Sequence, residues 1–119
     1  AARENAVDEL SGMDLGTVDK DVADILLDLA ARETKAKSSQ VADIILEAMH
    51  PKILRVSKAH RFAGFRVLKA PDIPSVLIEL GFLTNDADEK QLQSREYREL
   101  VASSIVRGVD AYYVTVKRR

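Results

Sequence analysis

The stretch from Pro74 to Phe82, PSVLIELGF, places one carboxylate within a run of apolar residues. A carboxylate is costly to bury unless it is paired or hydrogen-bonded, so Glu79 is the first candidate for a functional group. Side chains alternate between the two faces of a strand. The face of Glu79 becomes small and polar towards Gly81, where ligand sites open in α/β sheets. Periodicity alone slightly favours the alternative, a glutamate facing solvent on a half-exposed strand.

Two histidines offer the next candidate chemistry, metal binding. Glu47 and His50 are three positions apart, which places them on one face of a helix, and His60 follows in a loop. Zinc needs three or four such ligands. A pair of histidines without a ligand motif is more often a pair of surface residues, so the sequence identifies no metal ligand.

Other kinds of chemistry find no support in this chain of 119 residues. It has no cysteine, no G-x-S-x-G motif and no phosphate-binding loop. Its net charge of -1 gives no basic surface for nucleic acid. No apolar run approaches the roughly 20 residues of a membrane span.

The elements that would position these residues follow from the hydrophobic pattern. Residues 21–50 predict one long helix if their two apolar sets, which are in phase, are continuous, although a break at Ser38–Ser39 is the alternative. Residues 65–82 predict two strands, from Phe65 to Ala70 and from Ser75 to Phe82. Thr84 or Asn85 is expected to cap a short helix, and residues 96–113 to form the last one. The two apolar sets are Val22, Ile25, Leu26, Leu29 and Val41, Ile44, Ile45, Ala48.

This order of elements predicts an α/β fold, a mixed β-sheet flanked by helices. Two strands are too few for an independent sheet, so further strands are expected upstream. The chain opens with AARENAVDEL, which reads as a helix already in progress, without Met or a capping residue. We therefore expect residues 1–119 to be the C-terminal portion of a single domain.

The block from Ala63 to Leu92, AGFRVLKAPDIPSVLIELGFLTNDADEKQL, resembles the end of the zinc-dependent N-acetylmuramoyl-L-alanine amidases of the Amidase_3 type. The segments AARENAVDEL, DVADILLDLAARET and REYRELVASSIVRGVDAYY are also similar to this family. The similarity covers nearly the whole chain and is most specific from Val67 to Asn85. It is closest in character to the cell-division amidases of Gram-negative bacteria.

The resemblance implies a periplasmic peptidoglycan hydrolase that cleaves the amide between N-acetylmuramic acid and L-alanine of the stem peptide. It implies that Glu79 is the catalytic glutamate, the general acid/base beside a zinc-activated water. The family's zinc ligands precede the segment that this chain resembles, so the zinc is expected to be held outside this sequence. Alone, the chain is expected to be inactive.

The resemblance also implies regulation, since some division amidases block their zinc until an activator protein binds. Residues 1–20 are the expected regulatory region, with Glu4 or Glu9 as the blocking residue. Two alternatives to the enzyme remain. One is a non-catalytic module of the same fold that binds peptidoglycan or a protein, and the other is a helical interaction domain in which Glu79 is a solvated residue.

Overall fold

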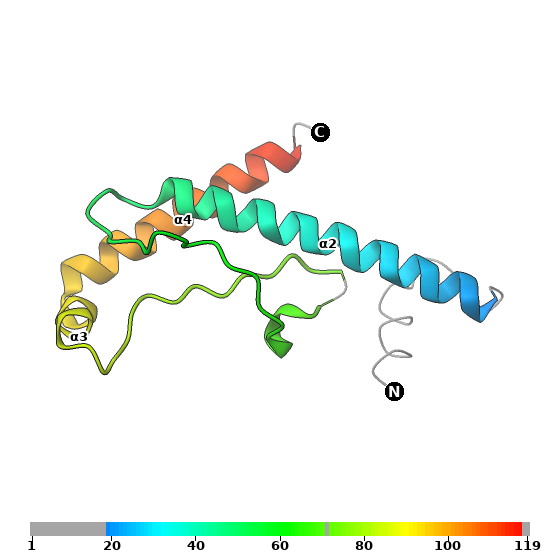
Figure 1. Ribbon diagram of the computed structural model, residues 1–119. Helices are drawn as coiled ribbons and strands as arrows, with labels where there is room; N and C mark the ends of the chain where they lie inside the picture. Colours follow the sequence, from blue (N-terminus) through cyan, green and yellow to red (C-terminus); the bar gives the residue numbers. More distant parts are fainter. Residues whose placement is uncertain (1–18, 71, 118–119) are drawn as a thin grey trace. The chain divides into compact units, whose positions relative to one another are not determined.

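A computed structural model describes residues 19–70 and 72–117 of the chain. Its elements, labelled in Figure 1 except for the short η2, are α2 (Lys20–Ala48), the 3₁₀ turn η2 (Arg66–Leu68), α3 (Asp86–Gln93) and α4 (Arg95–Lys117). The chain divides into two compact units, Ala1–Ser39 with Gly64–Ser75, and Gln40–Ala63 with Val76–Arg119. The predicted first helix, together with Glu4 and Glu9, lies outside the described residues.

Helix α2 is continuous from Lys20 to Ala48, so the two apolar sets lie on one helix and there is no break at Ser38–Ser39. The Asp19 carboxylate accepts a hydrogen bond from the backbone N–H of Asp21 at 3.3 Å and caps the helix start. Within the polar middle of the helix, Lys37 and Glu33 form an ion pair at 2.7 Å, one turn apart. Such pairs support a solvated helix face, which explains how the helix crosses its polar middle.

The prediction of a mixed β-sheet is wrong for the part of the chain that the structure describes, which is helical and contains no strand. The first predicted strand, 65–70, contains the turn η2, closed by bonds from the N–H of Leu68 to the Phe65 carbonyl and of Lys69 to the Arg66 carbonyl. The second, 75–82, is extended but belongs to no ladder. A strand exists only when its backbone pairs with a neighbour, and apolar alternation cannot supply that neighbour.

The apolar side chains of this second segment are correspondingly exposed. Alternation places Val76, Ile78, Leu80 and Phe82 on the face opposite Glu79. Leu80 and Phe82 are 43% and 68% exposed, while Val76 and Ile78 are half-buried. Leu77, on the other predicted face, is 50% exposed. Burial is therefore not divided between the two predicted faces.

In the first unit, one serine joins α2 to the segment that follows η2. The Ser38 hydroxyl donates to the Thr34 carbonyl at 2.9 Å and accepts from the backbone N–H of Ser75 at 3.0 Å. The hydroxyl thus satisfies a backbone donor that lies outside any helix. The Ser75 hydroxyl donates in turn to the Ile73 carbonyl at 2.9 Å.

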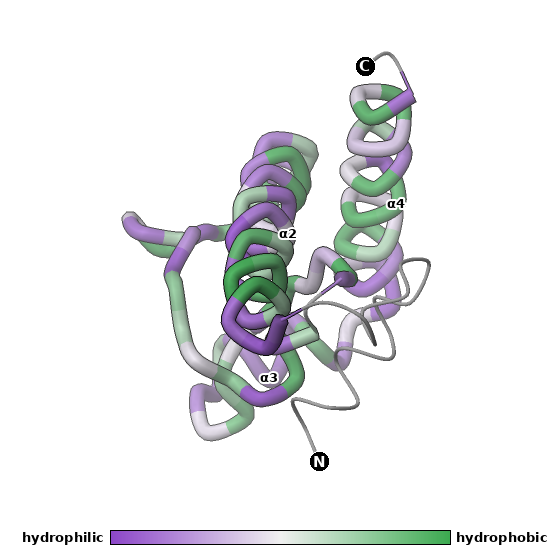
Figure 2. The backbone as a smooth tube through the Cα atoms, turned by 90° about the vertical axis from the view of Figure 1, so that its right-hand side faces the viewer, coloured by the Kyte–Doolittle hydropathy of each residue, from purple (hydrophilic) through white to green (hydrophobic). Residues whose placement is uncertain are grey.

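The second unit has a small core where α4 packs on the end of α2. Hydrophobic residues recur along α4 (Figure 2), and Val101 is 3% exposed there. On α2, Ile45 is 4% exposed, and a Cβ atom added at Gly108 of α4 would lie 2.8 Å from the Ile45 Cα. Ser104, one turn before Gly108, is fully buried. The small residues at 104 and 108 are what allow the two helices to approach so closely.

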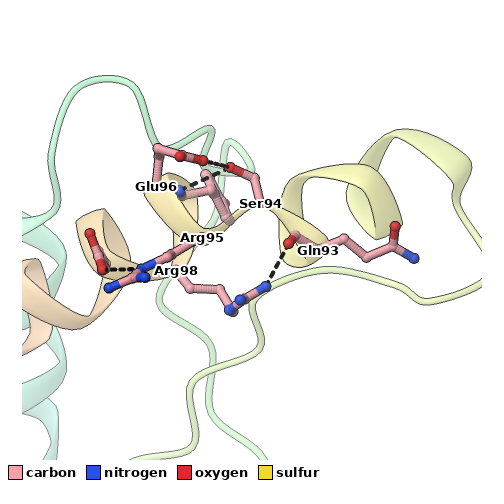
Figure 3. Close-up of polar contacts among 7 residues, drawn as sticks. Gln93, Ser94, Arg95, Glu96 and Arg98 are labelled. Carbon is pink, nitrogen blue, oxygen red and sulfur yellow. Dashed lines mark hydrogen bonds and ion pairs between the residues drawn. The ribbon is translucent and has the colours of Figure 1, made fainter.

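A single residue, Ser94, lies between helices α3 and α4. Its backbone N–H donates to the Lys90 and Gln91 carbonyls and ends α3, while its hydroxyl accepts from the N–H of Tyr97 at 3.3 Å and caps α4. Figure 3 shows the Arg98 guanidinium reaching back to the Gln93 carbonyl, at 2.7 Å. Arg98 therefore satisfies a carbonyl that the end of α3 leaves without a helical partner.

No helix within residues 19–70 and 72–117 combines the length and apolar character needed to cross a bilayer.

Candidate functional site

Glu79 lies in the extended segment before α3, and its side chain is exposed. Within the described residues it makes no ion pair. The cost of burying a carboxylate, which first drew attention to Glu79, therefore does not arise in this structure. An accessible carboxylate can accept a proton or a hydrogen bond from water or a ligand. Its predicted catalytic role stays a prediction.

The backbone immediately after Glu79 is held by α3. The Asp88 carboxylate accepts a hydrogen bond from the N–H of Phe82 at 2.9 Å. Gly81 has a φ of 154°, in a region that side-chain-bearing residues rarely adopt. A Cβ atom at Gly81 would lie 3.1 Å from Asp88, so the space beside Gly81 that the sequence offered to a ligand is bounded by this side chain.

The start of α3 is fixed by the cap that the sequence predicts. The Asn85 side chain accepts from the N–H groups of Ala87 at 3.0 Å and Asp88 at 3.1 Å. Three acidic residues in the first turn, Asp86, Asp88 and Glu89, complement the positive end of the helix dipole. Helix α3 therefore positions the Asp88 carboxylate, which holds the backbone N–H of Phe82. Phe82 lies three residues after Glu79 in the chain.

The two histidines have separate partners. The Nδ1 atom of His50 accepts from the N–H of Lys52 at 3.2 Å, and the Nδ1 atom of His60 lies 2.7 Å from the Asp43 carboxylate. The His60 ring also lies against Phe62, with the ring centroids 4.8 Å apart. Glu47, exposed on α2, makes no ion pair within the described residues. Each histidine thus has one ring nitrogen engaged by its own chain.

A zinc ion does not fit the donors that this part of the chain brings together. Among the residues that the structure describes, no three His, Asp or Glu side chains gather closely enough to hold a metal. Zinc requires three or four such donors around one point. Glu47, His50 and His60 therefore do not form the ligand set that was weighed from the sequence.

Sequence reasoning missed the buried hydroxyl that holds the second unit together. The Ser104 hydroxyl donates to the Leu100 carbonyl at 2.8 Å and accepts from the His50 N–H at 3.2 Å and from the Arg107 guanidinium at 2.9 Å. The apolar stripe of α4 was the available signal, because Ser104 lies between Val101 and Gly108 on its buried side.

The chain is similar to a known protein family over most of its length. A model of the Amidase_3 family, described as N-acetylmuramoyl-L-alanine amidase, matches residues 6–111. N-acetylmuramoyl-L-alanine amidase AmiA of Escherichia coli (strain K12) is 34% identical over 111 residues, 93% of this chain and 38% of the relative.

Two further relatives agree with this match. N-acetylmuramoyl-L-alanine amidase AmiC of Escherichia coli O6:H1 is 34% identical over 126 residues, which cover 100% of this chain and 29% of that protein. The probable N-acetylmuramoyl-L-alanine amidase AmiB of Haemophilus influenzae is 49% identical over 51 residues, 43% of this chain and 12% of that protein. The chain thus spans 29–38% of the length of AmiC and AmiA. No solved structure matches it.

Proposed function

We propose, since this chain belongs to the Amidase_3 family of N-acetylmuramoyl-L-alanine amidases, that it is part of a peptidoglycan hydrolase. The bond cleaved is the amide between the lactyl group of N-acetylmuramic acid and L-alanine of the stem peptide. The family match over residues 6–111 is the observation that carries this proposal. The names of relatives such as AmiA and AmiC support the same activity.

The role proposed for Glu79 is proton transfer. In amide hydrolysis a water oxygen attacks the carbonyl carbon, the C–N bond breaks, and the amine departs with a proton. A carboxylate can take that proton from the attacking water and deliver it to the leaving nitrogen. Glu79 is accessible to water, and Asp88 fixes the backbone three residues beyond it. These two features support the assignment, because proton transfer needs both access and position.

Three further properties are part of the proposed function and do not depend on the described residues. Zinc dependence is one, with ligands outside this sequence. A cell-wall location is the second, in the periplasm, where the substrate lies. An activator protein that acts through residues 1–20 is the third. Each requires the intact protein for its test.

The proposed activity is tested by incubating purified peptidoglycan with the intact protein and measuring released stem peptides. Glu79→Gln replaces the carboxylate by an isosteric amide that cannot take the proton. It is expected to lower turnover by about 10²- to 10⁴-fold. Because Glu79 is exposed, the melting temperature should stay close to that of the wild type. Glu47→Gln removes a carboxylate of α2 that is also exposed and serves as the matched control, with near-normal turnover.

Two outcomes would contradict the proposal in different ways. Near-normal hydrolysis by Glu79→Gln would contradict the catalytic role of Glu79 but not the proposed amidase activity. Tight binding of peptidoglycan by the wild type without any release of peptides, with zinc and activator supplied, would favour a non-catalytic binding module.

A further inference from the structure

The basic residues of this chain are unevenly distributed along its sequence. Between Glu47 and Asp72 there is no acidic residue, although the whole chain carries a net charge of -1. The segment between these two carboxylates contains six cations, Lys52, Arg55, Lys58, Arg61, Arg66 and Lys69. Such a run without a compensating carboxylate creates a local positive potential that attracts anions.

Four of these cations lie in one loop of the second unit, residues 52–61, which we call the basic loop. All four are exposed, and none forms an ion pair with a carboxylate within the described residues. The four are Lys52, Arg55, Lys58 and Arg61. Their charges are therefore available to a partner.

The basic loop folds back along the end of α2. Its first anchor is Arg55, whose guanidinium donates to the Leu46 carbonyl at 2.8 Å. Its second is His60, held 2.7 Å from the Asp43 carboxylate. Near its end, the Arg61 guanidinium donates to the Lys58 carbonyl at 3.0 Å. Two side chains of the loop thus bond to positions one turn apart on α2, which fixes the loop against the helix.

An open pocket of about 380 Å³ lies between the basic loop and α2. This volume falls within the usual range of small-ligand sites, about 300–1,000 Å³. Its walls combine three apolar side chains with three polar ones: Leu46, Val56, Ala59, and Arg55, Ser57, His60. The pocket could therefore take a small group with an alkyl part and a polar, negatively charged end.

We propose that this pocket binds the free carboxylate of a peptide. A guanidinium presents its N–H groups as a planar fork that matches the two oxygens of a carboxylate. Arg55 uses one N–H group on Leu46, and within residues 19–70 and 72–117 no other bond of its guanidinium competes with a ligand. The Ser57 hydroxyl supplies a further donor. Val56 and Ala59 offer contacts suited to a short side chain such as that of alanine.

The charges around the pocket favour an anion carrying a single charge. The end of a helix carries about half a negative charge, and Asp43 adds a carboxylate that His60 engages. The Arg55 guanidinium offsets the partial negative charge of the helix end through its bond to the Leu46 carbonyl. Three further cations keep the net charge of the basic loop positive after these two negative charges are offset: Lys52, Lys58 and Arg61. A guanidinium fork matches a phosphate as well as a carboxylate, so the preference for a single charge rests on the Asp43 carboxylate and the helix end nearby.

The identity of the peptide rests on the function proposed above, since the stem peptides of peptidoglycan carry free carboxylates. The carboxylate preference itself does not. The probes are a stem tetrapeptide and the same tetrapeptide with its carboxylates converted to carboxamides, titrated calorimetrically into the intact protein. Sodium phosphate is titrated in parallel. We expect the acid to bind at least about 10-fold more tightly than the amide, because charge-assisted hydrogen bonds are the strong ones.

Two substitutions of Arg55 separate the effect of the planar guanidinium geometry from the effect of its charge. Arg55→Gln is expected to lose at least about 10-fold in affinity for the acid and nothing for the amide. Arg55→Lys keeps the charge and should recover only part of the loss. Because Arg55 also bonds to Leu46, Ser57→Ala provides a variant that leaves this anchor intact, with a smaller loss expected. Lys90→Gln removes an exposed cation from α3 and should bind as the wild type does.

The outcomes distinguish this inference from the proposed function. Equal binding of acid and amide by a protein that still releases stem peptides would overturn the pocket assignment alone. Acid-selective binding that depends on Arg55, in a protein that releases no peptides, would support the pocket and contradict the amidase. Phosphate binding as tight as that of the acid, lost in Lys90→Gln as well as in Arg55→Gln, would reveal a general anion attraction and overturn the carboxylate site.

Discussion

The backbones of Gly108 and Ile45 approach so closely that a Cβ atom at Gly108 would lie 2.8 Å from the Ile45 Cα and 2.9 Å from its Cγ1. The nearest atom belongs to the backbone of α2, which cannot turn aside as the end of a side chain can. This contact fixes the distance between α2 and α4 in the second unit.

Gly108→Ala should therefore destabilise the protein, although alanine is the better helix former. The propensity gain of about 1 kcal/mol is opposed by an overpacking cost of about 1–3 kcal/mol, and the rigid contact makes the cost prevail. Denaturant unfolding would measure the difference. Gly64→Ala is the control, since nothing lies within 4 Å of the added atom. A stability gain in Gly108→Ala would show that the helices separate easily.

Ser104→Ala should cost about 1–3 kcal/mol of unfolding free energy, because the variant removes a fully buried hydroxyl and leaves the part-buried His50 N–H without its acceptor. Ser103→Ala is a close control. The Ser103 hydroxyl, like that of Ser104, donates to the Leu100 carbonyl, at 3.0 Å, but Ser103 is exposed. Ser103→Ala is therefore expected to change the unfolding free energy by no more than about 0.5 kcal/mol. Equal losses in the two variants would contradict the role given to Ser104.

Gly81→Ala should also be destabilising, for a conformational reason. The φ of 154° is unfavourable for alanine, at a cost of about 1–3 kcal/mol, and its Cβ would press on Asp88. In the intact protein we expect hydrolysis to fall as well, because Glu79 is two residues away. Asp88→Asn weakens the bond to Phe82 without touching φ. If both variants were fully stable and active, α3 would not position the glutamate.

The start of α4 should respond to acid through Glu96. Its own backbone N–H, and then the Ser94 hydroxyl at 2.9 Å, lower the pKa of this carboxyl from 4.5. A lowered folded-state pKa means that the carboxylate stabilises the fold above pH 4.5, and that this stability is lost as the pH falls through the folded pKa. The midpoints of wild type and Glu96→Gln should differ at pH 6 and converge in acid, by a small amount since the group is exposed. A constant difference would contradict this assignment.

Local patterns predicted the three α-helices of the described residues, 19–70 and 72–117. The in-phase apolar sets of residues 21–50 lie on the single helix α2, Asn85 is the one of the two predicted caps that α3 uses, and the helix predicted for residues 96–113 lies within α4. Each of these depends on the spacing of side chains along one helix or on a cap beside its end, which together determine whether a helix forms. Glu79 was found from its apolar neighbours, and its role remains a prediction.

Strands and close contacts escaped prediction because they depend on distant partners. The alternation in residues 75–82 predicts a face to be buried but not the strand that would bury it. The Gly108 approach required knowing that Ile45 lies opposite. The pocket at Arg55 arises from a loop without periodicity, anchored by bonds to the Leu46 carbonyl and to Asp43. In each case the deciding partner lies elsewhere in the chain.

The shared cap at Ser94 restricts how this segment of the chain can change in length. One residue both ends α3 and begins α4, so a single insertion or deletion there would rotate α4 by about 100° relative to α3 and carry Val101 out of the core. Natural variation in length is therefore expected to avoid this junction.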